Sequence, residues 1–572
     1  MMKRIICLLL LCVNGISYGQ KDEVIVITHG TRKIEPAYRM TSLPSIIDTV
    51  ISTKVVEYPL LVLQQETAIS VEPIKPAKIS TSSLLSTLYN SYAKIGIGSE
   101  LMPMGELFVN SKWNSKYVWG IHTKHLSSFG NFTNYAPAQF DRTKVDLTGA
   151  YLRPRFTLKS AVHYNNQGFH YYGWQIPTDS IDRKEIAQRY HDAGGVFTYL
   201  SHKADSATFN YGITADYNYF TNQKSYLDTN GDWRALENNI GFQFFGKYKT
   251  GKEILSGELT VRNNRYNYGS PGDTNLIAAD TGFVYNNTLV TFKPKITTLL
   301  KDNKFKAELG VDLSVDAAEK AKFYVFPLIE LKYALFNNIF IPYAGLRGGI
   351  KQNSLKALVN QNEFILTNQE LRNENTAIDF YAGIKGVLSK NIAFNASASF
   401  ARVKDKALFV TDTLLSVGNK FRAIYDTLNL TTIEASLTYQ LNEKIKIDGV
   451  GRYFSYALLN NSFAWNLPDW QGILRGHYNI YDKLIFNLDF NLEGGRKALV
   501  YESGENVVEE NNQFAKNLGM IADINLGAEY RLENKRLSAF IQFNNIASQS
   551  YQRWYNYPVQ RFQVMGGITA RF

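Results

Sequence analysis

The C-terminal part of the chain contains long segments in which apolar and polar residues alternate with a period of two. In the clearest of them one face carries Leu518, Met520, Ala522, Ile524, Leu526, Ala528 and Tyr530, and the other carries Gly519, Asp523, Asn525, Glu529 and Arg531. Successive side chains of a β-strand point to opposite sides of the sheet. Each such segment therefore predicts a strand with one apolar face and one polar, partly charged face that borders water.

From about Tyr92 to Phe572 these segments are joined alternately by tight polar turns and by longer, more variable connections, an arrangement typical of a β-hairpin array. Ten tight turns can be read, at residues 114–116, 153–155, 202–206, 250–252, 301–304, 337–338, 389–391, 442–444, 482–483 and 533–535. The eleven other connections include 131–141, 173–185, 223–234, 269–281, 352–375 and 494–513. These connections predict 22 strands, and a count of 20 is the alternative because the connections at 99–104 and 315–322 are short.

Short turns at one end and long loops at the other are typical of outer-membrane β-barrels. An even strand number places both barrel termini on the periplasmic side. A soluble β-sandwich also alternates, but it rarely joins more than twenty strands in one array. The predicted fold is therefore all-β, a transmembrane antiparallel β-barrel of about 22 strands (20–22) over residues 91–572, and the 13% of aromatic residues suits such a barrel.

The first 19 residues have the features of a secretory signal peptide, which is removed during export. Lys3 and Arg4 precede the apolar run from Ile5 to Val13, which is shorter than the roughly 20 residues of a membrane helix. Both cysteines of the chain, Cys7 and Cys12, lie in this segment. We therefore expect a barrel in the outer membrane of a Gram-negative cell, without disulfides or cysteine-bound metal.

Residues 20–90 differ from the rest, because five prolines interrupt short β-branched runs and no turn periodicity is present. This composition predicts an extended N-terminal segment in the periplasm or in the barrel lumen. Barrels of 22 strands have a wide lumen that is plugged in known examples. Our hypothesis is that residues 21–90 fold into the lumen, together with long inward loops such as Gln352 to Asn375.

The last strand alternates strictly and ends on an aromatic residue, and it resembles the signal by which the barrel insertion machinery recognises its substrates. The residues that carry this resemblance are Phe562, Val564, Ile568 and Phe572. Upstream, Phe543-Asn544-Asn545-Ile546, Tyr551, Tyr557-Pro558 and Arg561-Phe562 resemble, in a loosened form, the ending of TonB-dependent receptor barrels. The resemblance supports the barrel of that family more than its activity.

The predicted mature N-terminus resembles a TonB box, formed by Asp22, Glu23, Val24, Ile25, Val26 and Ile27. In that family the box pairs with a periplasmic TonB-type energy-coupling protein, which corresponds physically to strand addition at a sheet edge. An inert extended leader is the alternative. Gly30-Thr31-Arg32 resembles the start of the family's plug domain, but only about 70 residues precede the first strand, so the chain is most similar to barrel-only members with a vestigial plug.

Aromatic clusters at residues 169–174, 465–470 and 554–557 lie at strand ends next to the longer loops. Rings at this level form the interfacial girdles of membrane barrels, and we expect that role here. A carbohydrate-stacking platform is the alternative.

The chain has no His-Glu-x-x-His pair, no Gly-x-Ser-x-Gly elbow and no Walker loop, so we expect no enzyme activity, no cofactor and no metal site. A hydrolase whose site is assembled across strands is the remaining enzymatic alternative. The net charge of +11 comes from dispersed basic residues, which argues against nucleic-acid binding.

Three functions remain open: a TonB-dependent-receptor-like barrel that takes up or captures a solute, a passive porin-like channel, and a structural or assembly partner of another surface protein. Fold alone does not separate them. The expected partners are outer-membrane lipid, the insertion machinery, the energy-coupling protein and a surface lipoprotein.

Overall fold

The computed structural model describes residues 89–572, except for residues 113, 115, 174–182, 202–208, 224–233, 270–282, 302–303, 319, 337–338, 443, 505 and 533–535. The predicted signal peptide (1–19), nearly all of the segment 20–90 and the TonB-box residues 22–27 lie outside this part of the chain. They stay predictions.

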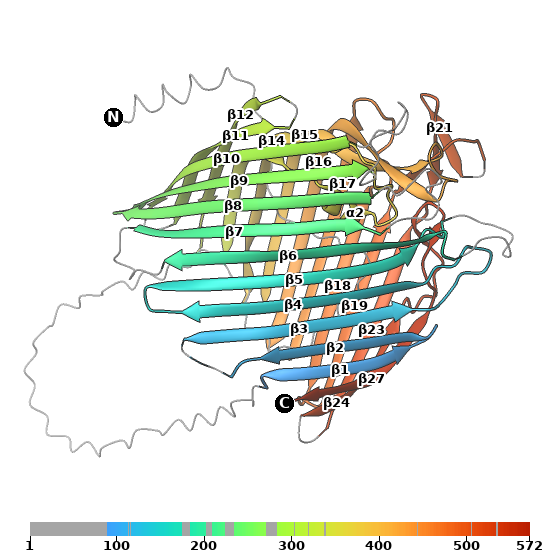
Figure 1. Cartoon of the computed structure of the whole chain (residues 1–572). Helices are drawn as coiled ribbons and strands as arrows, with labels where there is room; N and C mark the ends of the chain where they lie inside the picture. The colour runs from blue at the N-terminus through green and yellow to red at the C-terminus, as the bar shows by residue number, and fades with distance from the viewer. Residues whose placement is uncertain are drawn as a thin grey trace, which may run out of the picture.

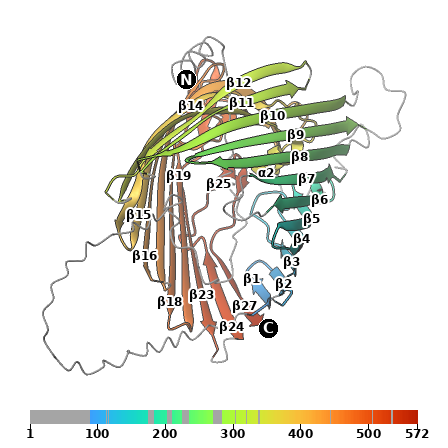
Figure 2. The same ribbon diagram turned by 90° about the vertical axis from the view of Figure 1, so that its left-hand side faces the viewer.

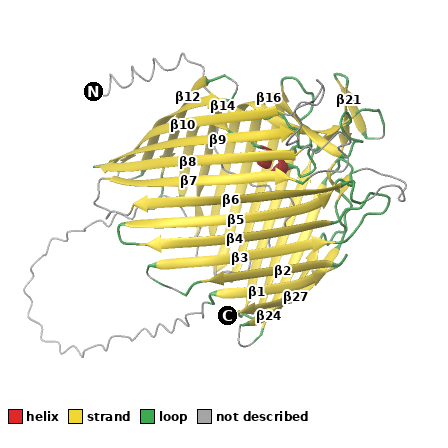
Figure 3. Cartoon of the chain, viewed as in Figure 1, coloured by secondary structure: helices red, strands yellow, loops and turns green. Residues whose placement is uncertain are grey.

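The described chain is almost entirely β-structure (Figure 3). The first eleven strands are β1 (Ser91–Gly98), β2 (Met102–Asn110), β3 (Tyr117–Ser128), β4 (Phe140–Leu152), β5 (Phe156–His170), β6 (Ala187–Ser201), β7 (Phe209–Asn222), β8 (Arg234–Thr250), β9 (Glu253–Gly269), β10 (Phe283–Leu300) and β11 (Phe305–Ala317). The next eight are β12 (Lys322–Tyr333), β13 (Phe340–Lys351), β14 (Glu374–Ser389), β15 (Ile392–Asp412), β16 (Lys420–Asn442), β17 (Ile445–Leu458), β18 (Trp470–Ile480) and β19 (Leu484–Gly494). The last long strands are β23 (Ile521–Arg531), β24 (Leu537–Asn544) and β27 (Gln563–Arg571).

These 22 strands form one closed sheet. Each pairs antiparallel with its neighbours along the chain, and β1 pairs with β27 to close the ring (Figure 1). The predicted antiparallel barrel of about 22 strands is therefore confirmed. The backbone of Phe572 contributes to the closure, since its N–H donates to the Ser91 carbonyl at 2.9 Å and its carbonyl accepts from the Ser91 N–H at 3.0 Å.

Each of the ten tight turns predicted from the sequence falls, to within one residue, between the bounds of two consecutive strands, and these strand ends all lie at the same end of the barrel. Residues 202–206, 337–338 and 533–535 themselves lie outside the described part of the chain. We call this end, at the left of Figure 1, the turn end, and the opposite end the loop end. The longer loops at the loop end contain α2 (Leu355–Gln361) and the short strands β20 (Lys497–Val500), β21 (Val507–Glu510), β22 (Gln513–Asn517), β25 (Gln552–Trp554) and β26 (Tyr557–Pro558). In the described residues, no helix has the length and apolar character that a membrane span needs.

The two faces of the sheet differ as the alternation predicts. Ile95 and Ile97 on β1 and Ile568 on β27 are each more than half exposed on the outer face, whereas Met565 and Thr569 point into the lumen and are buried. Of the predicted assembly signal, Val564 and Ile568 occupy outer-face positions of β27, and Phe562 and Phe572 flank the strand with exposed side chains. Their role in assembly stays a prediction.

Candidate functional site at the loop end of the barrel

The loop between β13 and β14, residues 352–373, crosses the lumen at the loop end, and we call it the cap. Figure 2, viewed from the turn end, shows α2 of the cap and β25 of the β24–β27 loop inside the ring of strands. The cap contacts lumen-facing residues from β4 to β16. The expectation that the loop Gln352 to Asn375 points inward is confirmed, with its last two residues already part of β14.

The cap begins with the short helix α2, which is fixed by its N-cap. The Ser354 side chain accepts from the Ala357 N–H, which satisfies one of the unpaired donors of the first turn. Leu355, Leu358 and Val359 are buried on one face of the helix. They join an aromatic core that is formed with side chains from the barrel wall.

A buried carboxylate on the wall holds the start of this helix. Glu237 on β8 is fully buried and accepts from the backbone N–H groups of Leu355 at 2.7 Å and Lys356 at 2.9 Å. It also accepts from the side-chain amide of Asn264 on β9 at 2.7 Å. A buried carboxylate with three donors is well satisfied, and removal of it would leave buried donors without a partner.

Two ion pairs attach the cap to strands β4 and β6 of the wall. Lys356 Nζ lies 2.7 Å from Asp192 on β6. Arg142 on β4 donates from Nη2 to both carboxylate oxygens of Glu363 in the cap, each at 2.9 Å. These charges are only partly exposed, so solvent screens them less than ion pairs at an open surface.

Backbone hydrogen bonds fix the second half of the cap. Ile365 forms a parallel bridge with Phe421 on β16, with N···O distances of 2.8 Å and 3.0 Å on either side. Tyrosine hydroxyls from the wall donate to cap carbonyls, with Tyr171 bonded to Ile365 at 3.2 Å and Tyr190 to Glu363 at 3.2 Å. The cap is therefore bound to the barrel through both side chains and main chain.

The β24–β27 loop packs on the cap from the side of the last strands. The Tyr557 ring stacks on Phe364 with centroids 3.8 Å apart, and Trp554 packs edge-on against Phe409. Tyr172 donates to the Pro558 carbonyl at 3.0 Å. Burial raises the pKa of Tyr557 well above that of an ordinary phenol, so its hydroxyl remains a neutral donor.

A buried arginine connects this loop to the β19–β23 loop. Arg496 donates to the carbonyls of Arg553 at 2.8 Å and Gln552 at 2.9 Å, and it pairs with Glu493 at 3.2 Å. Burial lowers the pKa of Arg496 to about 10. Loops from distant parts of the chain thus form one connected layer around the cap.

The girdle interpretation of the aromatic clusters is wrong for most of their members. Phe169, Tyr171, Trp465, Trp554 and Tyr557 are all buried, and all but Trp465 belong to the core around the cap. Trp465 lies in a neighbouring buried cluster. These rings lie at strand ends as expected, but they point into the folded loops, a direction that spacing along the chain does not reveal.

A small hollow of about 180 Å³ lies in the lumen wall beside the cap, on β14 to β17. Its floor is apolar, with Val403, Leu428 and Leu430, and its rim carries the Glu374–Lys406 ion pair at 3.1 Å. Such a mixed surface suits a solute with an apolar body and a polar group. Within the described ranges, no three His, Cys, Asp or Glu side chains gather as metal ligands.

The sequence-based prediction did not find Glu237, Asp192 or Arg142 as contacts of the cap. In the sequence each is one of many charged residues on a polar strand face, and nothing distinguishes it from its neighbours. Alternation predicts that these three residues face the lumen, but it does not predict which residue of the cap each of them contacts.

A closed antiparallel barrel of 22 strands with a long inward loop is a fold that several solved structures share with this chain. The structure is similar to the iron transporter FrpB of Neisseria meningitidis (F3-3 variant), with a TM-score of 0.63, 10% sequence identity, and coverage of 85% of this chain and 82% of that chain. It is also similar to the ferric-catecholate import receptor Fiu of Escherichia coli K12, with a TM-score of 0.60, 11% identity, and 85% and 82% coverage.

A third similar structure is the pyoverdine outer membrane receptor FpvA of Pseudomonas aeruginosa PAO1 bound to pyoverdine, with a TM-score of 0.59, 12% identity, and 85% and 78% coverage. No protein-family model matches the sequence, and no curated protein matches it. At these identities the likeness concerns the fold, which is that of TonB-dependent receptor barrels, as the C-terminal motif predicted.

Proposed function

We propose that this protein takes up a solute across the outer membrane through a gated, receptor-type barrel. The observation that carries the proposal is the cap, which crosses the mouth of a wide barrel and is bound to its wall on several sides. A passive porin needs an open path, whereas a receptor needs a closed barrel that opens on demand. The turn end then faces the periplasm and the loop end faces the medium.

The segment at residues 22–27 supplies the energy coupling in this proposal. Pairing with the edge of a partner sheet uses the backbone N–H of every second residue, so one of the neighbours Val24 and Ile25 donates to the partner. Val24→Pro and Ile25→Pro each remove one N–H, and one of the two removes the pairing donor. At least one variant should lose binding to a purified TonB-type protein and lose uptake, and retained uptake in both would contradict this part of the proposal.

The solute class follows from a growth experiment. The similar structures are named for iron and ferric chelates, so iron chelates are the first solutes to test as sole iron sources. Growth that needs both this protein and the energy-coupling system supports the receptor. Energy-independent uptake with steady open conductance indicates a porin, and a stoichiometric co-purifying protein with neither phenotype indicates an assembly partner.

Movement of the cap can be tested with a disulfide, because both native cysteines lie in the first 12 residues. Ile365 and Phe421 are bridge partners, and such pairs have Cα atoms close enough for a disulfide. Ile365→Cys with Phe421→Cys should block uptake when oxidised and restore it when reduced. Each single variant is the control, and uptake through the oxidised protein would show that the cap does not move.

A further inference from the structure

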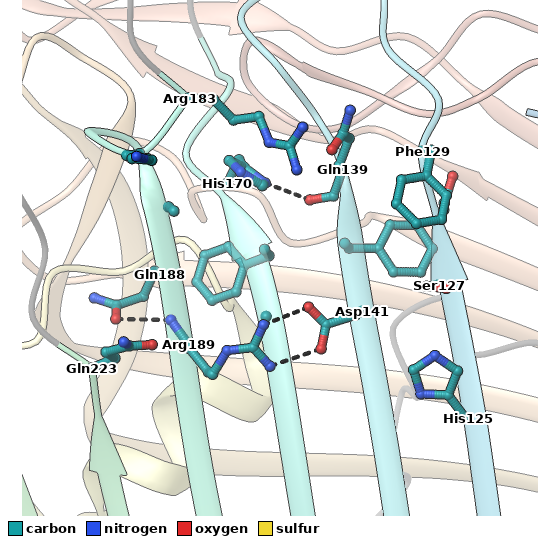
Figure 4. A pocket seen from close by; sticks show the side chains of 16 residues that line it. His125, Ser127, Phe129, Gln139, Asp141, His170, Arg183, Gln188, Arg189 and Gln223 are labelled. Atoms are coloured by element: carbon teal, nitrogen blue, oxygen red, sulfur yellow. Dashed lines mark hydrogen bonds and ion pairs between the residues drawn. The ribbon is translucent and has the colours of Figure 1, made fainter. Parts of the chain in front are cut away.

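The outer surface of the barrel has a charged hollow of about 440 Å³ at the loop end, over β3 to β6. It is lined by Arg189 and Asp141 on the strands and by Arg183 and Lys184 on the β5–β6 loop, and Phe129 lies at its rim (Figure 4). Arg189 donates to both oxygens of Asp141 at 2.7 Å. The hollow is thus lined by three cationic side chains and one carboxylate.

The strand register shows that this hollow faces outward. Arg142, Gln167 and Tyr190 contact the cap and so point into the lumen. Their strand neighbours Asp141, Gly168 and Arg189 form one cross-strand row and point the opposite way. The row is completed by Ser127 on β3.

One more polar row, formed by His125, Thr143, Asn166 and His191, follows toward the turn end, and beyond it the outer face becomes apolar. Parallel rows toward the turn end contain the exposed side chains of Ile121, Leu147 and Val162, and then those of Trp119 and Phe197. The last row contains Tyr117, which is 56% exposed. This sequence of rows is the lipid-facing band of a membrane barrel followed by its aromatic girdle.

The height of the hollow can be estimated from the strand geometry. Ser127 follows Tyr117 by ten residues on β3, which corresponds to about 33 Å along a strand and about 25 Å along the membrane normal at a tilt of about 40°. An apolar band of a bacterial outer-membrane barrel is about 25 Å tall. The hollow therefore lies at the level of the lipid headgroups at the loop end.

We propose that this hollow binds the phosphorylated headgroup of a glycolipid in the outer leaflet. Arg and Lys side chains bind phosphate oxygens through charge-assisted hydrogen bonds. The Asp141 carboxylate holds the guanidinium of Arg189 in place, and the apolar rows below accept the acyl chains. The inference rests on the proposed outer-membrane location, but not on solute transport.

The test measures binding of bisphosphorylated lipid A to the full-length barrel in detergent by native mass spectrometry. Wild type should bind one lipid saturably, and Arg183→Gln combined with Lys184→Gln should weaken binding at least tenfold. Lys116→Gln combined with Lys252→Gln makes the same charge change at the turn end and should have no effect. Arg189→Gln is a second variant that should also weaken binding, and heat-modifiable gel mobility confirms that each barrel is folded.

Two further arms identify the ligand chemistry. Dephosphorylated lipid A should bind weakly, and inorganic phosphate in the millimolar range should not compete. Equal binding by the Arg183/Lys184 variant, or equal binding of dephosphorylated lipid, overturns the proposal. Competition by inorganic phosphate would identify a site for soluble anions instead, and this also overturns it. Because binding is measured without a solute or an energy-coupling protein, its failure leaves the proposed uptake function untouched.

Discussion

Arg142 and Glu363 are separated by 221 residues in the chain, yet the Arg142 guanidinium lies 2.9 Å from both carboxylate oxygens of Glu363. The contact connects β4 to a loop that begins at β13. It shows that the cap extends across the mouth to strands far from its own.

This contact can be measured with Arg142→Gln, Glu363→Gln and the double variant. We expect a coupling of about 1 kcal/mol in the free energy of local cap opening, since the pair is partly buried and Arg142 Nη2 donates to both oxygens of Glu363. Hydrogen exchange of peptides that cover residues 354–372 reports this free energy. Additive effects of the two substitutions would show that the pair does not hold the cap.

Removal of the Glu237 carboxylate should lower the free energy of local cap opening more than loss of the Arg142–Glu363 pair does. Glu237→Ala leaves the N–H groups of Leu355 and Lys356 without their acceptor in a buried site, at a cost of about 2 kcal/mol. Hydrogen exchange of α2 should become more than tenfold faster. Glu434→Ala is the control, because Glu434 pairs with Arg452 on the lumen wall, and equal acceleration in both variants would contradict the assigned role.

The sequence determines the barrel well and the cap poorly, for a physical reason. Strand positions, the ten turns and the two faces follow from a period of two and from turn residues, which are local signals. The position of the cap depends on contacts such as Ile365 with Phe421 and Tyr557 with Phe364. Those contacts join distant segments, and the apolar rings involved also fit a lipid-facing girdle.

A tight contact between Gly173 and Tyr557 provides a steric test of the packing. A Cβ at Gly173 would overlap the Tyr557 ring, which is buried and packed on Phe364. Gly173→Ala should destabilise the layer around the cap by about 1–3 kcal/mol, measured as faster exchange in residues 545–562. Gly105→Ala has open space around its Cβ and should leave exchange unchanged; equal behaviour of both variants would refute the packing.

Arg496 should be irreplaceable by lysine. Its guanidinium reaches the carbonyls of Gln552 and Arg553 together, and a lysine ammonium lacks the planar fork needed for both. Arg496→Lys should accelerate exchange in residues 549–558 several-fold. Arg475→Lys is the matched control, since Arg475 is largely exposed on β18; an unchanged rate in Arg496→Lys would remove its role as a connection between the loops.

The predicted role of the Phe572 ring in assembly can be tested separately from the role of its backbone in barrel closure. Phe572→Ala removes the ring but keeps both backbone hydrogen bonds to Ser91, so a several-fold loss of folded barrel in cells would reflect recognition of the ring. Tyr530→Ala removes an equally outward ring and should have little effect. Normal assembly of Phe572→Ala would contradict the signal.

Closure of the barrel by the cap can be tested directly by single-channel conductance in planar bilayers. Four proteins are compared: the full chain, a deletion of residues 23–80, the full chain with residues 354–372 replaced by a short Gly/Ser linker, and the combination. Replacement of the mostly exposed residues 413–418 in the β15–β16 loop is the control. We predict that the combined variant opens stable, large conductance steps and that the deletion alone does not. Equal conductance of the deletion and the combined variant would contradict closure by the cap.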